Sequence, residues 1–234
     1  MWPFKKSTTA IRQSGLLNNL TDWHSHILPG VDDGVKTMEE SLDILKTFDE
    51  LGVKRVWLTP HIMEDFPNTP ADLRNRFKEL QDVWTGNVEL RLAAENMLDT
   101  LFEERLEAND LLPIGEEGNH LLIETSYYTP PYGMDDMIEG IFSKGYFPIL
   151  AHPERYRYME EKDYIKLRER GVKMQMNYLS LVDAYGETAR KKAEWLLSKG
   201  MIDYTGSDIH RHQAFLSGID RNSAKQKAIT MIKK

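Results

Sequence analysis

Two pairs of potential metal ligands lie near opposite ends of this sequence. His24 and His26 are separated by one residue, and so are Asp208 and His210. In a β-strand the side chains alternate between faces, so His24 and His26 would point the same way, roughly 6.5 to 7 Å apart along the strand. Imidazole and carboxylate groups suit a divalent cation. The two pairs therefore predict one metal site that brings both ends of the chain together.

Further residues of the same chemical types stand where other apolar segments end. Five of the seven histidines belong to this group. A lone histidine at a strand end is more often structural than a ligand, but six strands that each present His, Asp or Glu at the same end are hard to obtain by chance. The complete set of candidate metal ligands is His24, His26, Asp33, His61, Glu95, Glu124, His152, Asp208 and His210.

The elements that would position these residues alternate between strand and helix. Apolar runs predict strands around His24 and over 55–61, 88–97, 120–124, 147–152, 173–177 and 201–208. Amphipathic spacing predicts helices after Thr37 and over 70–84, 98–112, 134–144, 163–170 and 187–199, with a last helix from Asn222. This alternation indicates parallel βαβ units, whose functional groups gather at the carboxyl ends of the strands. Seven units predict a single-domain (β/α)7-type barrel.

Composition restricts the class of protein. The chain has 234 residues, of which 41% are hydrophobic and 29% are charged, a balance typical of a globular domain. The formal charge of −7 argues against a surface that coats nucleic acid, and no apolar run is long enough to span a bilayer. There is no cysteine, so any metal must bind to His, Asp and Glu, and no cysteine nucleophile is available.

The first twenty residues differ from the rest. Met1-Trp2-Pro3-Phe4-Lys5-Lys6 is followed by Ser and Thr rather than by a continuous apolar core, so it does not have the pattern of a secretory signal. We therefore expect a cytoplasmic protein. We interpret residues 1–20 as a flexible leader and residues 21–234 as one metal-dependent domain.

The order of the motifs resembles a known superfamily. His-x-His, Asp-Asp-Gly, Pro-His, Ala-Glu, Ile-Glu, Ala-His-Pro-Glu-Arg-Tyr and Ser-Asp-x-His follow one another over residues 21–212. This order and spacing are similar to the polymerase and histidinol phosphatase (PHP) superfamily. More narrowly, they resemble its bacterial manganese-dependent protein-tyrosine phosphatases, which are encoded with capsule and exopolysaccharide genes. The resemblance implies a distorted (β/α)7 barrel, the PHP fold, with three divalent metal ions.

The resemblance also implies a role for each matching residue. The first ion would be held by His24, His26, Glu95 and Asp208; the second by Glu95, Glu124 and His152; and the third by Asp33, His61 and His210. Nitrogen and oxygen ligands fit Mn²⁺, the metal that the resemblance implies, and also Fe, Mg or Zn. Arg155 would contact the substrate phosphate. Another arginine usually follows the last motif in this family; here Arg211 is adjacent to His210, and whether it reaches the phosphate is open.

The charges alone favour a phosphate substrate. Four candidate carboxylates carry −4 and three divalent ions would carry +6, which leaves about +2 at the site. We hypothesise hydrolysis by a water whose pKa the cations lower, while the cations and Arg155 neutralise developing charge. With Arg155, we name His152 and Asp208 as the catalytic residues.

The substrate that the resemblance implies is the phosphotyrosine-bearing tail of a membrane tyrosine kinase that governs polysaccharide export. Two alternatives stay open: a small-molecule phosphatase of the histidinol-phosphatase type, and a metal-binding regulatory module without catalysis. The loop Tyr127-Tyr128 with Pro130-Pro131-Tyr132 could line the substrate mouth or be a rigid packed loop. His120 and His212 are expected at the surface or behind the ligands, with His212 the better functional candidate.

Overall fold

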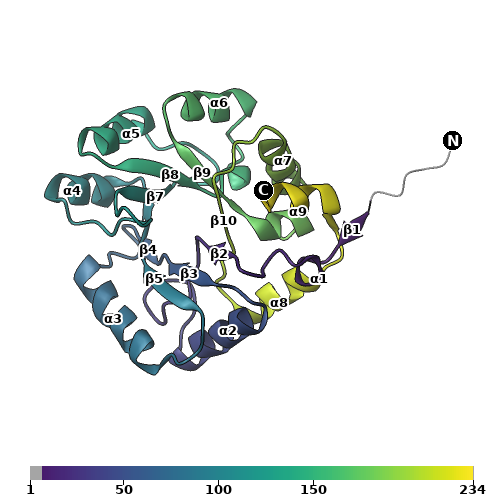
Figure 1. Cartoon of the computed structure of the whole chain (residues 1–234). Coiled ribbons are helices and arrows are strands. Elements are labelled where there is room, and N and C mark those ends of the chain that lie inside the picture. Colours follow the sequence, from purple (N-terminus) through teal and green to yellow (C-terminus); the bar gives the residue numbers. More distant parts are fainter. Residues whose placement is uncertain (1–6, 234) are drawn as a thin grey trace.

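The computed structural model describes residues 7–233, and its elements follow one another in the order that Figure 1 shows. The strands are β1 (Thr8–Thr9), β2 (Thr21–Asp22), β3 (Arg55–Leu58), β4 (His61–Ile62), β5 (Glu89–Leu92), β6 (Glu95–Met97), β7 (His120–Glu124), β8 (Phe147–Ala151), β9 (Lys173–Asn177), β10 (Tyr204–Gly206) and β11 (Ala224–Lys225). The helices are α1 (Ile11–Ser14), α2 (Met38–Glu50), α3 (Pro70–Val83), α4 (Thr100–Ala108), α5 (Met134–Ser143), η1 (Pro153–Arg155), α6 (Glu161–Glu169), η2 (Tyr178–Val182), α7 (Glu187–Ser198), α8 (His212–Asp220) and α9 (Gln226–Ile232), where η marks a 3-10 helix.

The central strands form two parallel sheets. One has six strands in the order β10-β9-β8-β7-β6-β4, and the other has three in the order β2-β3-β5. Helices α2 to α7 lie around the outside of both sheets, so the strands are covered as parallel strands must be. The fold is therefore a single mixed α/β domain (Figure 1).

The structure has the parallel α/β architecture of the distorted (β/α)7 barrel that we expected, but its strands are divided between two sheets and do not form one closed ring. The strand predicted over 55–61 is broken into β3 and β4 by Thr59 and Pro60, and the strand predicted over 88–97 is broken at Ala93 and Ala94. Proline has no N–H to donate to a ladder, and Ala94 donates instead to the carbonyl of Leu112 at 3.2 Å. Each broken strand therefore begins in the three-stranded sheet and ends in the six-stranded one.

Local sequence signals explain the helices. Thr37 caps α2 by accepting a hydrogen bond from the Glu40 N–H at 3.2 Å, and Thr69 caps α3 in the same way through Asp72. In α2 the buried face contains Ile44, Leu45 and Phe48. Helix α8 was not predicted from the sequence. Arg211, its N-cap residue, makes no side-chain capping bond, so the usual sequence signal for a helix start is missing.

The segment that we expected to be a leader is packed onto the domain from Thr8 onward. β1 pairs antiparallel with β11, more than two hundred residues later in the chain, and Ile11 and Leu17 are buried in the core. The sequence did not indicate this pairing because its partner strand has only two residues. The part of the expected leader over residues 1–6 lies outside the described residues.

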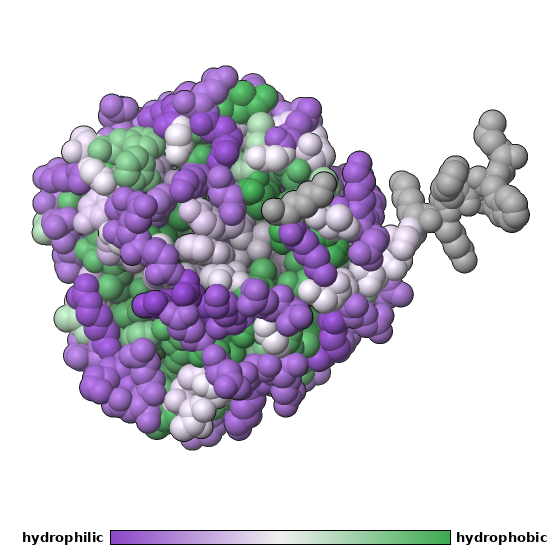
Figure 2. Space-filling model, viewed as in Figure 1, coloured by the Kyte–Doolittle hydropathy of each residue, from purple (hydrophilic) through white to green (hydrophobic). Residues whose placement is uncertain are grey.

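The surface agrees with a globular domain. Hydrophilic residues are spread over the face in Figure 2, with smaller apolar areas between them. Among the residues that the structure describes, no helix is both long and apolar enough to cross a membrane. The exposed large apolar side chains include Tyr128 and Tyr132, both in the loop between β7 and α5.

Candidate metal centre and phosphate site

The ends and breaks of the central strands bring the candidate ligands together. Glu124 is the last residue of β7, and His152 follows β8 directly. His61 and Glu95 are the first residues beyond the breaks, where β4 and β6 begin, and they face each other in the ladder register. The irregular backbone at the two breaks therefore turns both side chains toward the residues that follow β2 and β10.

Two imidazoles face each other at the centre of this cluster. The Nε2 atoms of His24 and His26 are 3.0 Å apart. His24 Nδ1 lies 2.8 Å from the Gln175 Oε1, and His26 Nδ1 lies 2.8 Å from the Asp32 Oδ2. Because both partner oxygens can only accept, each Nδ1 carries a proton, which leaves the two Nε2 atoms facing each other inside the cluster. Two nitrogen atoms this close repel unless a cation, a proton or a metal ion, lies between them.

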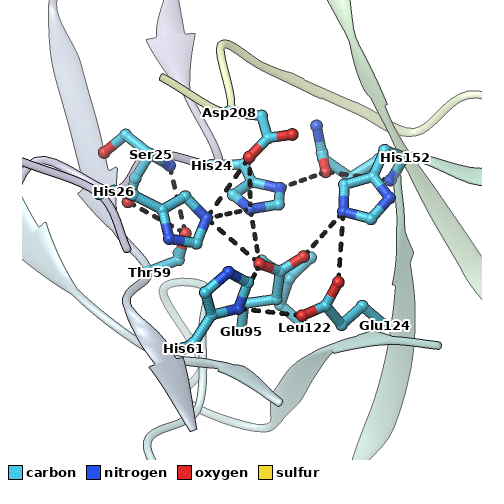
Figure 3. Close-up of polar contacts among 12 residues, drawn as sticks. His24, Ser25, His26, Thr59, His61, Glu95, Leu122, Glu124, His152 and Asp208 are labelled. Atoms are coloured by element: carbon cyan, nitrogen blue, oxygen red, sulfur yellow. Dashed lines mark hydrogen bonds and ion pairs between the residues drawn. The ribbon is translucent and has the colours of Figure 1, made fainter. Parts of the chain in front are cut away.

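Glu95 lies between four histidines (Figure 3). Its Oε2 is 3.2 Å from the Nε2 atoms of both His24 and His26 and 3.1 Å from the His61 Nδ1, while its Oε1 is 2.9 Å from the His152 Nε2. The Glu95 Oε2 and the His61 Nδ1 are both buried, and neither has a hydrogen-bond partner. Bound cations would supply the partners that these buried polar atoms lack.

The remaining candidates complete the cluster. His61 Nδ1 is 2.9 Å from the Glu124 Oε1, and Asp208 Oδ1 is 3.4 Å from the His26 Nε2. Asp33 Oδ1 is 3.4 Å from the His61 Nε2 and 3.3 Å from the His210 Nε2. Four groups of ligand atoms lie close enough to hold an ion: His26, Asp33, His61 and His210; His24, Glu95 and His152; His24, His26 and Asp208; and His61, Glu95 and Glu124.

All nine predicted ligands therefore meet in one place, although their division among individual ions is not fixed by this geometry. The residues fit divalent metal ions because they offer only nitrogen and oxygen atoms, several of them buried without a hydrogen-bond partner. Asp33 is half exposed and opens the cluster to solvent, whereas Glu95 is fully buried.

The electrostatics of the cluster are those of a cation site. Burial opposes a charge on the His24 imidazole, but Glu95 and Asp208 outweigh burial and raise its pKa to about 9. Burial and the neighbouring Glu95 both raise the pKa of Glu124. A hydrogen bond from His210 lowers the pKa of Asp33 to about 2. The carboxylates thus create a negative potential that favours bound positive charge.

Arg155 stands where the cluster opens into a cavity of about 550 Å³. Its guanidinium lies 4.4 Å from the ring centroids of both Tyr127 and Tyr185, and its Nη1 donates to the Asp208 Oδ2 at 2.5 Å. Arg155, Asp33 and Asp208 all line this cavity. A planar cation held between two rings at the mouth of a metal cluster is well placed to bind a phosphate.

The other residues that the sequence analysis discussed lie outside the cluster or support it. His212 Nε2 is 2.8 Å from the Thr47 Oγ1 and so connects α8 with α2, while His120 lies at the start of β7. Arg211 Nη1 donates to the carbonyls of Asp33, Gly34 and His210 at 2.6 to 2.8 Å, which fixes the loop that carries Asp33.

Four supporting residues were missed by the sequence analysis: Asp32, Gln175, Asn177 and Tyr185. The Asp32 Oδ2 accepts hydrogen bonds from the His26 Nδ1 and, at 3.0 Å, from the His61 backbone N–H. Its position beside Asp33 in the Asp-Asp-Gly turn was the one signal that could have identified it. Gln175 and Asn177 alternate along β9, and two polar residues on one face of a buried strand are a similar signal. For Tyr185 the sequence contains no comparable pattern.

Comparison with known proteins identifies related tyrosine phosphatases. The family model described as "Capsular polysaccharide synthesis, CpsB/CapC" matches residues 20–234. Tyrosine-protein phosphatase YwqE of Bacillus subtilis is 26% identical over 228 residues, which cover 92% of this chain and 84% of YwqE. Tyrosine-protein phosphatase CpsB of Streptococcus pneumoniae is 29% identical over 204 residues, which cover 82% of this chain and 83% of CpsB.

A solved structure has the same fold. It comes from the crystal structures of YwqE from Bacillus subtilis and CpsB from Streptococcus pneumoniae, which are described as unique metal-dependent tyrosine phosphatases. The TM-score is 0.76 at 25% identity, and the match covers 92% of this chain and 86% of the solved chain. The family model thus spans the whole region from His24 to His210, and the solved structure shares the fold over most of the chain.

Proposed function

The chain belongs to the CpsB/CapC family of capsular polysaccharide synthesis proteins, and we propose that it is a metal-dependent protein-tyrosine phosphatase. The observation that carries this proposal is the meeting of nine nitrogen and oxygen ligands beside Arg155 in one cavity. The named relatives YwqE and CpsB are tyrosine-protein phosphatases. The proposed complement is three divalent ions, with Mn²⁺ the preferred metal, distributed over the ligands as the family resemblance implies.

The residues have distinct tasks in the proposed reaction. Divalent ions would supply Lewis acidity, which lowers the pKa of water and neutralises phosphate charge. Arg155 binds the phosphate oxygens, and its stacking between Tyr127 and Tyr185 fixes the plane of the guanidinium before the substrate arrives. His152 Nε2 lies 2.9 Å from the Glu95 Oε1 and Asp208 Oδ1 lies 3.4 Å from the His26 Nε2, so both residues would hold the ions beside the bound phosphate. The proposed reaction is a direct hydrolysis that needs no phosphoenzyme, which suits a chain without cysteine.

The proposed substrate is the phosphotyrosine-bearing tail of a membrane tyrosine kinase that regulates capsule or exopolysaccharide synthesis. The family description and the names of the relatives support this choice. The tail would be reached from the cytoplasm, so the proposal includes a cytoplasmic location. An extended tail could enter the open cavity beside Arg155, where Tyr127 and Tyr185 offer aromatic faces to a phosphotyrosine ring.

The experiment compares hydrolysis of a phosphotyrosine peptide with hydrolysis of histidinol phosphate by the full chain loaded with Mn²⁺. We expect faster turnover of the peptide, complete loss of activity after chelation, and recovery when Mn²⁺ is restored. The variants His152→Ala and Asp208→Ala should lose activity while circular dichroism stays that of a folded protein. Preference for histidinol phosphate would assign a small-molecule phosphatase instead. Metal binding without hydrolysis of either substrate would indicate a regulatory module.

A further inference from the structure

Two buried amide side chains connect the metal ligands at the two ends of the sequence. Gln175 and Asn177 both lie on β9 and are fully buried. His24 Nδ1 is 2.8 Å from the Gln175 Oε1, the Gln175 Nε2 donates to the Asn177 Oδ1 at 3.0 Å, and the Asn177 Nδ2 donates to the Asp208 Oδ2 at 2.7 Å. Gln175 and Asn177 are therefore the middle of a chain of hydrogen bonds from His24 to Asp208.

This series of hydrogen bonds has only one consistent order of donors and acceptors. A carboxylate at Asp208 can only accept, so Asn177 must turn its amide nitrogen toward it and its oxygen toward Gln175. Gln175 must then turn its nitrogen toward Asn177 and its oxygen toward His24. The last acceptor in the series fixes the proton of His24 on Nδ1 and leaves the lone pair of Nε2 directed into the cluster. The amide pair thus selects the tautomer that can bind a metal.

The same contacts divide the two oxygens of Asp208. Its Oδ2 accepts from Asn177 and from the Arg155 Nη1 at 2.5 Å. Its Oδ1 faces the imidazoles, 3.6 Å from the His24 Nε2 and 3.4 Å from the His26 Nε2. The Asp208 Oδ1 therefore faces the cluster, while its Oδ2 binds Arg155. Asp208 thus connects the metal ligands to the predicted phosphate-binding residue.

Asn177 is itself fixed from a third side. Its backbone N–H donates to the Glu154 Oε1 at 3.0 Å, and the same oxygen accepts from the Ser180 Oγ at 2.7 Å. Glu154 is buried and directly precedes Arg155 in η1. The end of β9 is thus attached to the segment that carries Arg155, so that the amide pair cannot shift without moving that segment.

We propose that Gln175 and Asn177 are positioning residues, which set the tautomer of His24 and the orientation of Asp208 so that both can bind a divalent ion. The inference rests on the proposed metal-dependent function, because it concerns the same cluster. Its physical basis is that partners behind a metal ligand contribute to affinity, typically by 10- to 100-fold. Neither residue touches the substrate in this account, so neither is a catalytic residue.

The test measures Mn²⁺ binding by isothermal titration calorimetry, with metal content by elemental analysis, for the full chain and its variants. Gln175→Leu removes the acceptor for His24, and Asn177→Asp places a second carboxylate against Asp208. We expect each to weaken Mn²⁺ binding by about 10- to 100-fold. Met176→Ala is the matched control. Met176 lies between the two amides on β9 and is equally buried, but it faces the other side of the sheet, in the apolar core. It should lower stability and leave Mn²⁺ affinity unchanged.

A second measurement needs no metal. In metal-free protein with ¹⁵N-labelled histidine, measured at an alkaline pH at which the His24 ring is neutral, the nitrogen shifts of His24 should indicate a proton on Nδ1. Gln175→Glu keeps an acceptor at this point and should preserve that signature, whereas Gln175→Leu should lose it. Unchanged His24 shifts and unchanged Mn²⁺ affinity in Gln175→Leu would overturn the inference. A native chain that binds no Mn²⁺ would instead refute the proposed function, while the tautomer measurement would still decide the role of the amides.

Discussion

At the scale of single residues, Arg155 is the side chain whose environment is most specific to its proposed role. It is stacked on Tyr127 and Tyr185 and also donates to Asp208. A lysine would keep the positive charge but would lose the planar fork and both stacking contacts. Replacement of Arg155 by lysine therefore tests whether phosphate binding depends on the shape of the guanidinium as well as on its charge.

Arg155→Lys should lower kcat/KM for a phosphotyrosine peptide by about 100-fold, since loss of one preorganised donor commonly costs 10²- to 10³-fold. Mn²⁺ content should stay the same. Steady-state kinetics and elemental analysis measure the two quantities. Arg157→Lys is the matched control, because Arg157 also stacks on a tyrosine, 4.8 Å above the Tyr128 ring, but does not line the cavity at the cluster. Equal losses in both variants would argue that stacking near the surface, and not phosphate contact, is responsible.

At the scale of the elements, close approach of β10 to the segment after β2 is what brings the ends of the chain together. A Cβ added at Gly206 would lie 2.5 Å from the His24 Cβ and 2.7 Å from the His24 backbone nitrogen. Both atoms are held by the backbone of His24, so neither can move away without displacing that backbone. Only glycine lets β10 lie this close to His24. The same added Cβ would also lie 3.0 Å from the Gln175 Nε2.

We expect Gly206→Ala to push β10 away from His24, to lower the free energy of unfolding by about 1 to 3 kcal/mol, and to weaken Mn²⁺ binding, because the strand displacement would also move Asp208. Chemical denaturation and calorimetric titration measure these effects. Gly140→Ala is the matched control. Gly140 lies within α5, and its added Cβ would meet only the Leu106 Cδ2 at an ordinary 3.5 Å, so this variant should be neutral or slightly stabilising. Gly206→Ala with native metal affinity would disprove the close-approach argument.

The elements also show how far the sequence could predict this structure. Strands occur at or beside each of the seven places where an apolar run indicated one, since burial of parallel strands leaves a direct pattern in the sequence. The first, β2, ends at Asp22, so His24 and His26 lie just beyond the strand rather than on it. The break at Pro60 and the pairing of β1 with β11 were not predictable, because both depend on which distant backbone groups supply hydrogen bonds. The same holds for the site. The nine ligands are His, Asp or Glu residues near the ends of predicted apolar runs or in the turn after the first run, and so could be recognised. Gln175 and Tyr185, in contrast, gain their roles only from neighbours far along the chain.

At the scale of the whole molecule, the ligand cluster joins the two sheets. His24, His26 and Asp33 follow β2 of the three-stranded sheet, while Glu95 and Glu124 belong to β6 and β7 of the six-stranded sheet. On one side of the cluster the chain itself joins the sheets, where β3 continues into β4 and β5 into β6. On the other side, between β2 and β10, the contacts are hydrogen bonds such as the one from the Trp23 N–H to the Thr205 carbonyl at 3.0 Å. Bound cations would therefore act as cross-links on this second side.

Removal of the metal should accordingly loosen the whole fold as well as abolish turnover. A ligand that binds only the folded state at a hundred times its Kd contributes about 2.7 kcal/mol per site, so chelation should lower Tm and added Mn²⁺ should restore it. Differential scanning calorimetry measures this shift. Hydrogen exchange should show where it arises. We expect faster exchange over residues 23–34 and 207–211, which follow β2 and β10 and carry ligands, and little change in α5 and α6, which lie on the outside of the six-stranded sheet (Figure 1). Uniformly faster exchange would mean that the ions stabilise the domain without acting as a junction between its two sheets.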